Sequence, residues 1–233
     1  LDISRRFGAE ACDCCPPSLT SKGDTIVAIF RNNDSNIREF RAMMSTDNGL
    51  TFNDSIGIDD GNWVVSVCPS SKASTLILNN NLYSTYMSDA KVYVVKSDLT
   101  TGAQISRNIV TGASGTENYP QIASNGDTTI AVWEGSGNSK DLYINIFKSD
   151  LNDFMTADSY AIVDSSNSQY SPDIEIFNDQ IFITYTDNAT STVRFMKGIF
   201  GVESDTSLAI GNKLLPFKIY PNPTNGYINL NRS

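Results

Sequence analysis

The 233-residue sequence contains no histidine, the side chain that proteins use most often as a general base and as a metal ligand. Acid-base chemistry would therefore fall to aspartate, glutamate, tyrosine or lysine. Basic residues are also scarce, with 17 Lys and Arg against 26 Asp and Glu, which gives a net charge of −9. Nucleic acid is thus not an expected partner, because no cluster of positive charge is present to attract phosphates.

Long apolar runs are missing as well. No stretch approaches the roughly 20 residues that a membrane-spanning helix needs, so no membrane span is expected. The sequence begins at Leu1 without a charged-then-apolar leader, so we expect a signal peptide to have been removed or to lie outside it. With 40% hydrophobic and 18% charged residues, the composition is that of a globular protein, and no cofactor is expected.

Cysteine is rare but clustered. The four cysteines are Cys12, Cys14, Cys15 and Cys68, the first three within "ACDCCPP". An even number in an exported protein usually forms disulfides, whereas a thiolate site for a soft metal is the alternative. Zinc sites prefer two residues between paired ligands and this cluster has one or none, so disulfides are favoured and no metal is assigned.

The sequence repeats with a period of about 50 residues. One marker is a proline at intervals of 52, 51 and 52 residues: Pro17, Pro69, Pro120 and Pro172. A second is a serine at the end of an apolar run, at intervals of 52 residues: Ser45, Ser97 and Ser149. Two independent series with one period indicate a structural repeat.

Short β-rich runs such as "TIVAIF", "IREFRAMM", "TTIAVW" and "QIFITY" lie within each repeat, bounded by Asn, Asp and Gly. Such runs predict strands, and no segment predicts a helix. Repeats of this length with four short strands each predict a β-propeller in which one repeat makes one blade. The sequence therefore predicts an all-β fold with about four blades.

The stretch "STDNGLTF" is by itself a turn between two apolar runs. It also resembles the Asp box, or BNR repeat, of the sialidase superfamily, with the pattern carried by Ser45, Asp47, Gly49, Thr51 and Phe52. Further segments, "ACDCCPPSL", "FRNNDSNIREF" and "GNWVVSVCP", look like parts of secreted sialidase-like proteins of Bacteroidetes. The resemblance covers residues 10–200. It implies a sialidase-type propeller, usually of six blades, in which Asp boxes are structural turns between the third and fourth strands.

The composition changes after residue 200. Residues 201–216 lack a strand pattern and are expected to form a linker, and 217–233 begin with a β-turn-β pattern. The motif "YPNPTNG" within this last part is similar to the opening of the type IX secretion sorting domain, a β-sandwich that would be truncated here. The resemblance implies a secreted or outer-surface protein with the type IX machinery as a partner. Residues 1–200 would then be the propeller.

Antiparallel blades place the loops between second and third strands on the same face as the loops between blades. The candidate ligand-binding residues on that face are Arg31, Asp34, Arg38 and Trp63. Guanidinium groups suit carboxylate recognition, and an aromatic ring suits stacking on a sugar. The alternatives are ion pairs of the arginines with Asp34 and Glu39, and packing of the indole between blades.

Catalytic candidates are Glu134, which holds the position of Arg31 two repeats later, and two tyrosines that precede repeat prolines at equivalent positions 51 residues apart, Tyr119 and Tyr170. The sialidase resemblance implies an arginine cluster, a tyrosine nucleophile paired with a carboxylate, and an aspartate acid/base. The aromatic-Arg-Ile-Pro motif of many sialidases is absent from the sequence. The first hypothesis is therefore a module that binds a glycan or protein; the alternative is an exo-α-sialidase-type glycoside hydrolase acting on terminal acidic sugars.

Overall fold

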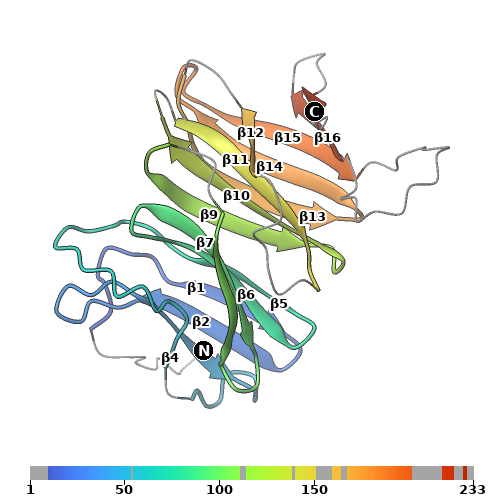
Figure 1. The fold of residues 1–233 in the computed structure, drawn as a ribbon. Coiled ribbons are helices and arrows are strands. Elements are labelled where there is room, and N and C mark those ends of the chain that lie inside the picture. The colour runs from blue at the N-terminus through green and yellow to red at the C-terminus, as the bar shows by residue number, and fades with distance from the viewer. Residues whose placement is uncertain are drawn as a thin grey trace. The chain divides into compact units, whose positions relative to one another are not determined.

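The computed structural model describes residues 10–53, 55–110, 114–137, 140–150, 159–163 and 167–200, together with the backbone of two strands at 217–222 and 228–229. No helix occurs in these ranges, and the strands form four antiparallel sheets (Figure 1). The all-β prediction is thereby confirmed. Two compact units divide the chain, the first holding two sheets from residues up to 109 and the second holding the other two.

The first unit contains blades 1 and 2, each a sheet whose four strands pair in chain order. The strands of blade 1 are β1 (Ser18–Lys22), β2 (Thr25–Arg31), β3 (Phe40–Ser45) and β4 (Ile56–Gly57). Those of blade 2 are β5 (Ser74–Leu78), β6 (Asn81–Ser88), β7 (Lys91–Asp98) and β8 (Gln104–Ile109). Such hairpin-connected sheets of four short strands are propeller blades.

The second unit contains blades 3 and 4, with the same order of pairing. The strands of blade 3 are β9 (Glu117–Ser124), β10 (Thr128–Ser136), β11 (Lys140–Lys148) and β12 (Ser159–Val163). Those of blade 4 are β13 (Gln169–Phe177), β14 (Gln180–Asp187), β15 (Thr192–Phe200) and β16 (Phe217–Asn222), with β17 (Ile228–Asn229) beyond. The four blades confirm the β-propeller fold class that the repeat predicts.

Each unit has its own apolar core between its two sheets. In the first unit, alternate side chains of the strands meet, with Val27, Ile29 and Phe40 of blade 1 against Leu82 and Tyr86 of blade 2. In the second unit the core is built mostly from β-branched residues: Ile130, Val132, Ile144, Ile174, Ile181 and Ile183. Branched side chains fill the space between pleated sheets well, which explains the strand preference of these runs.

The segment Phe217–Asn222 pairs with β15, from Phe200 opposite Phe217 to Phe195 opposite Asn222. Its backbone thus supplies the fourth strand of blade 4. The expected linker, 201–216, lies outside the described residues, and the division of the chain at residue 200 and at residue 217 stays a prediction. Within the described ranges, no helix is long and apolar enough to cross a membrane.

Candidate functional site

The Asp-box residues close the turn that follows β3, at the place between third and fourth strands that the resemblance implies. The Ser45 hydroxyl donates to Asp47 Oδ1 at 2.7 Å and accepts the Gly49 backbone N–H at 2.8 Å. The other side of the Asp47 carboxylate accepts the Thr51 hydroxyl at 2.5 Å. Gly49 has a φ of 82°, which favours glycine, and the Phe52 ring is half-buried beside the turn.

Hydrogen bonds within this turn hold the Asp47 carboxylate in place. Hydrogen bonds from the Thr51 side chain and backbone, and from Ser45, lower the pKa of Asp47 to about 2. A carboxylate held this firmly in its charged form by local donors is a poor proton donor at neutral pH. Asp98 ends β7 in a related turn, where it accepts the Thr101 backbone N–H at 2.7 Å. These contacts support a structural role for the box.

Arg31 is fully buried at the end of β2. Its Nη1 donates to the Arg38 carbonyl at 2.8 Å and its Nη2 to the Met87 carbonyl at 2.6 Å, so one guanidinium joins the main chains of blades 1 and 2. The group also lies 4.0 Å from the Phe40 ring centroid and 5.5 Å from that of Trp63. Burial lowers the pKa of Arg31, and nearby Cys15 and Asp59 oppose that shift. Both Nη groups, which a substrate carboxylate would need as donors, are already used.

The structure brings Arg31, Arg38 and Trp63 into one cluster. Arg38 is buried, its backbone N–H donates to the Trp63 carbonyl at 2.8 Å, and its Nη1 contacts the sulfur of Cys12 at 3.2 Å. Asp34 lies apart, exposed at the tip of the β2–β3 loop. Within the described part of the chain, no ion pair joins either arginine to Asp34 or Glu39, so that alternative is not what the structure shows.

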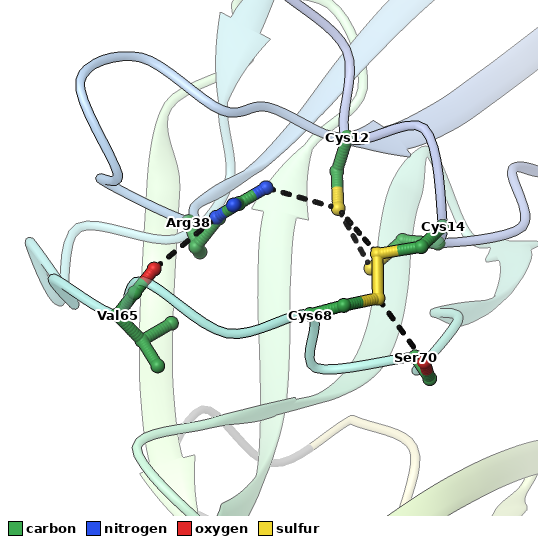
Figure 2. Close-up of a disulfide and its surroundings, with 7 residues drawn as sticks. Cys12, Cys14, Arg38, Val65, Cys68 and Ser70 are labelled. Atoms are coloured by element: carbon green, nitrogen blue, oxygen red, sulfur yellow. Dashed lines mark hydrogen bonds between the residues drawn. A yellow bond between two sulfur atoms is a disulfide. The ribbon is translucent and has the colours of Figure 1, made fainter.

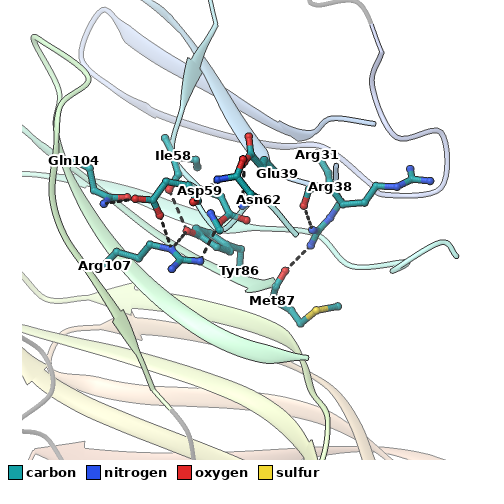
Figure 3. A network of polar contacts seen from close by, with 12 residues as sticks. Arg31, Arg38, Glu39, Ile58, Asp59, Asn62, Tyr86, Met87, Gln104 and Arg107 are labelled. Atoms are coloured by element: carbon teal, nitrogen blue, oxygen red, sulfur yellow. Dashed lines mark hydrogen bonds and ion pairs between the residues drawn. The ribbon is translucent and has the colours of Figure 1, made fainter. Parts of the chain in front are cut away.

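The sequence did not predict a second polar network, which lies in the same unit (Figure 3). Arg107 on β8 forms ion pairs with Asp59 at 3.0 Å and Asp60 at 3.3 Å, and its guanidinium stacks 3.8 Å from the Tyr93 ring centroid. Arg107 Nε also donates to the Tyr86 hydroxyl oxygen at 3.1 Å. No local motif signals this network, because 48 residues separate Arg107 from Asp59.

A tyrosine beside a carboxylate and an arginine resembles the parts of an activated glycosidase nucleophile. The burial of the tyrosine argues against that role. Tyr86 is fully enclosed, and its hydroxyl donates to the Ile58 carbonyl at 3.1 Å. Burial, and after it the charge of Asp59, raise the pKa of Tyr86 well above its usual value, so the phenol stays protonated. Burial alone would lower the pKa of Arg107, but Tyr86 and Asp59 raise it overall. We interpret this network as a packed clamp between blades 1 and 2.

Glu134 on β10 is buried in the second unit. Its Oε1 accepts the Lys140 ammonium at 2.7 Å, and its Oε2 accepts the Ser171 backbone N–H at 2.8 Å. The Lys140 ammonium also lies 4.7 Å from the Tyr170 ring centroid. Sequence candidates Glu134 and Tyr170 are therefore brought together through Lys140, but both carboxylate oxygens already have partners.

Tyr119 lies on β9 and has a φ of 48°. Its backbone N–H donates to the Asn118 side chain at 2.8 Å. The residue that shares its place directly before a repeat proline is Ser171, with a φ of 50°, whereas Tyr170 stands one position earlier. The two tyrosines are therefore not structural equivalents, which corrects the sequence alignment of the two repeats.

The cysteines meet at one point, from segments 54 residues apart (Figure 2). A disulfide joins Cys14 to Cys68, as the sequence favours, with the two Cα atoms 6.3 Å apart. It ties the segment before β1 to the segment before β5. Cys12 and Cys15 are free and buried, with their sulfurs 3.1 Å apart. The ligand atoms of all four cysteines lie within 4.8 Å of one another.

No protein-family model matches the sequence, and no curated protein matches it. Among solved structures, the chain is similar to a subtype N11 neuraminidase-like protein from a flat-faced bat in Peru, with a TM-score of 0.52, 10% identity, and coverage of 92% of this chain and 56% of that one. A subtype N10 neuraminidase-like protein from a little yellow-shouldered bat in Guatemala gives a TM-score of 0.51 at 10% identity, over 78% of this chain and 54% of that one.

A GH43 protein, BlXynB from Bacillus licheniformis, is similar over 79% of this chain at 8% identity and a TM-score of 0.46. The chain spans about half the length of the two neuraminidase-like proteins and 40% of the length of BlXynB. At such identities the two neuraminidase-like structures support the fold alone, a β-propeller.

Proposed function

We propose that the protein is a secreted or cell-surface β-propeller that binds a glycan, and that the described residues do not carry out glycoside hydrolysis. The observation that supports this most directly is the state of the two charged groups best placed for chemistry. The Arg31 guanidinium donates to two main-chain carbonyls, and the Glu134 carboxylate accepts from Lys140 and Ser171. Groups that bind a substrate need free donors or acceptors, and these are occupied.

The proposed binding surface is the β2–β3 loop with the adjoining Trp63. The loop closes in a tight turn in which Asp34 and Ile37 exchange two backbone hydrogen bonds, of 3.2 and 2.8 Å. The turn residues Ser35 and Asn36 have φ values of 52° and 70° and are exposed. Carboxylate and amide side chains can accept from and donate to sugar hydroxyls, and the half-buried Trp63 ring offers an apolar face for a pyranose.

The second candidate function is a hydrolase of the exo-α-sialidase type, acting on terminal acidic sugars. The juxtaposition of Tyr170, Lys140 and Glu134 favours it, because a phenol beside an ammonium and a carboxylate has the parts of an activated nucleophile. The contacts of the buried Glu134 argue against it, because one carboxylate oxygen already accepts the half-exposed Lys140 ammonium and the other accepts the Ser171 backbone N–H.

The proposal that the protein is exported rests on a motif near the end of the sequence. The motif "YPNPTNG", Tyr220–Gly226, is similar to the start of a type IX sorting domain, so we propose that the type IX machinery exports the protein to the medium or the outer surface. Fractionation of the source cells tests this. Protein found only inside the cells would contradict it.

A glycan array tests the binding function. The full natural protein is expected to retain a defined set of glycans, and Trp63→Ala or Asn36→Ala is expected to weaken binding about tenfold or more, as loss of an anchoring contact does. Thr46→Ala, exposed at the opposite end of β3, is the control and should bind like the wild type. No glycan bound by a folded wild-type protein would overturn the proposal, and capture of a protein ligand instead would replace its ligand class.

A further inference from the structure

The positive charges of two buried arginines in the first unit, Arg31 and Arg38, are not balanced by neighbouring carboxylates. Within the described residues, neither Arg31 nor Arg38 forms an ion pair with a carboxylate. The charge of Asp59 acts on Arg31, but the Asp59 Oδ1 is paired with Arg107. Arg31 Nε is buried without a hydrogen-bond partner. Buried charges are normally paired, so this region lacks negative charge.

A hydrogen-bond donor reaches the neighbouring sulfur atoms. Arg38 Nη1 lies 3.2 Å from the sulfur of Cys12, which in turn lies 3.1 Å from the sulfur of Cys15. A neutral thiol or disulfide sulfur is a weak acceptor, whereas a thiolate is a strong one. Donors on coordinating sulfurs are typical of the outer shell of a metal site.

We propose that Cys12, Cys14, Cys15 and Cys68 together form a tetrathiolate site for a soft divalent cation of the zinc class. Zinc–sulfur bonds of about 2.3 Å in a tetrahedron put the sulfurs about 3.8 Å apart, which fits a cluster whose four sulfurs already lie within 4.8 Å. The site bridges the segment before β1 and the segment before β5. One divalent ion with four thiolates carries two negative charges, and these balance Arg31 and Arg38.

The binding reaction needs no redox step when the chain folds with four thiols. The ion displaces four protons and forms four metal–sulfur bonds. The Cys14–Cys68 disulfide is the competing, metal-free form, in which two thiols have lost two protons and two electrons to an oxidant of the thiol–disulfide oxidoreductase class.

The test uses the full chain, produced with zinc in the medium and purified under nitrogen without added oxidant. Elemental analysis by mass spectrometry is expected to find about one zinc ion per chain, and acid release followed by thiol titration should find all four thiols free. Replacement of zinc by cobalt should give the absorption bands of a tetrahedral cobalt thiolate. This readout needs no variant, so it holds even where a cysteine substitution prevents folding.

Variants then separate the ligands from their surroundings. Cys12→Ser and Cys68→Ser are expected to lose the ion, and Arg38→Met is expected to weaken zinc affinity about 10- to 100-fold, as loss of an outer-shell donor does. Arg41→Met, on the same blade but bonded to Ser55 instead of a sulfur, is the matched control and should keep the ion. A folded chain that is produced and purified in this way and still holds no zinc, whether its thiols are free or Cys14 is bonded to Cys68, would overturn the proposal.

Discussion

Replacement of Arg31 by methionine tests whether this buried guanidinium is structural. Methionine has a similar length and no donors, so the change leaves the carbonyls of Arg38 and Met87 without the hydrogen bonds of 2.8 and 2.6 Å. A buried acceptor left unpaired costs about 1–3 kcal/mol, and the contact with the Phe40 ring adds about 1 kcal/mol. The new apolar side chain returns part of this through burial. We expect the free energy of unfolding to fall by about 2–5 kcal/mol.

Urea denaturation followed by tryptophan fluorescence measures this loss, because Trp63 lies 5.5 Å from the Arg31 guanidinium. Arg41→Met is the matched control. Arg41 is half-buried and donates only to Ser55, at 3.0 and 3.1 Å, so its loss should cost about 1 kcal/mol or less. An Arg31→Met protein as stable as the Arg41→Met protein would refute the structural interpretation, above all if ligand binding were lost at the same time.

Two further predictions concern stability. Asp47 has a pKa of about 2, below the value of about 3.9 for an unfolded chain, so its turn stabilises the fold above about pH 4 and loses that effect as the pH falls toward 2. Asp47→Asn should therefore reduce the drop in melting temperature between pH 4 and pH 2, and an unchanged drop would contradict this. Gly115→Ala makes a Cβ clash with the Ser136 carbonyl oxygen and should lower the melting temperature by several degrees. A Cβ at Gly137 would lie 3.6 Å from the Ser114 hydroxyl, an ordinary contact, so Gly137→Ala should leave the melting temperature unchanged. Equal losses of melting temperature in the two variants would contradict the predicted clash at Gly115.

The period of the sequence predicts the blades because each repeat carries its own strands and turns. The run "TIVAIF" becomes β2 and "TTIAVW" lies within β10, since alternating or continuous apolar residues specify a strand locally. The strand prediction for the run "IREFRAMM" is less accurate. Its strand starts only at Phe40, because Ile37 closes the tight turn with Asp34 and the Arg38 carbonyl accepts from Arg31.

The candidate site could be predicted only in part. The sequence places Arg31, Arg38 and Trp63 together correctly, because strand order fixes which loops share a face. It cannot show that Arg31 is buried, since the carbonyl of Met87 that accepts from it lies 56 residues away. The same holds for Arg107, which reads as an isolated cation on an outer strand until the fold brings it to Asp59. Long-range polar pairing leaves no periodic signal in one sequence.

Hydrolysis of a fluorogenic sialoside by the full natural protein is the most direct test of the central claim, that the buried charged groups hold the propeller together and leave a binding surface without catalysis. We predict no turnover above the uncatalysed rate. Glu134→Gln, which keeps the size of the side chain but removes its charge, is the comparison. Turnover by the wild type that a folded Glu134→Gln protein lacks would contradict the account and establish Glu134 as part of a glycosidase site.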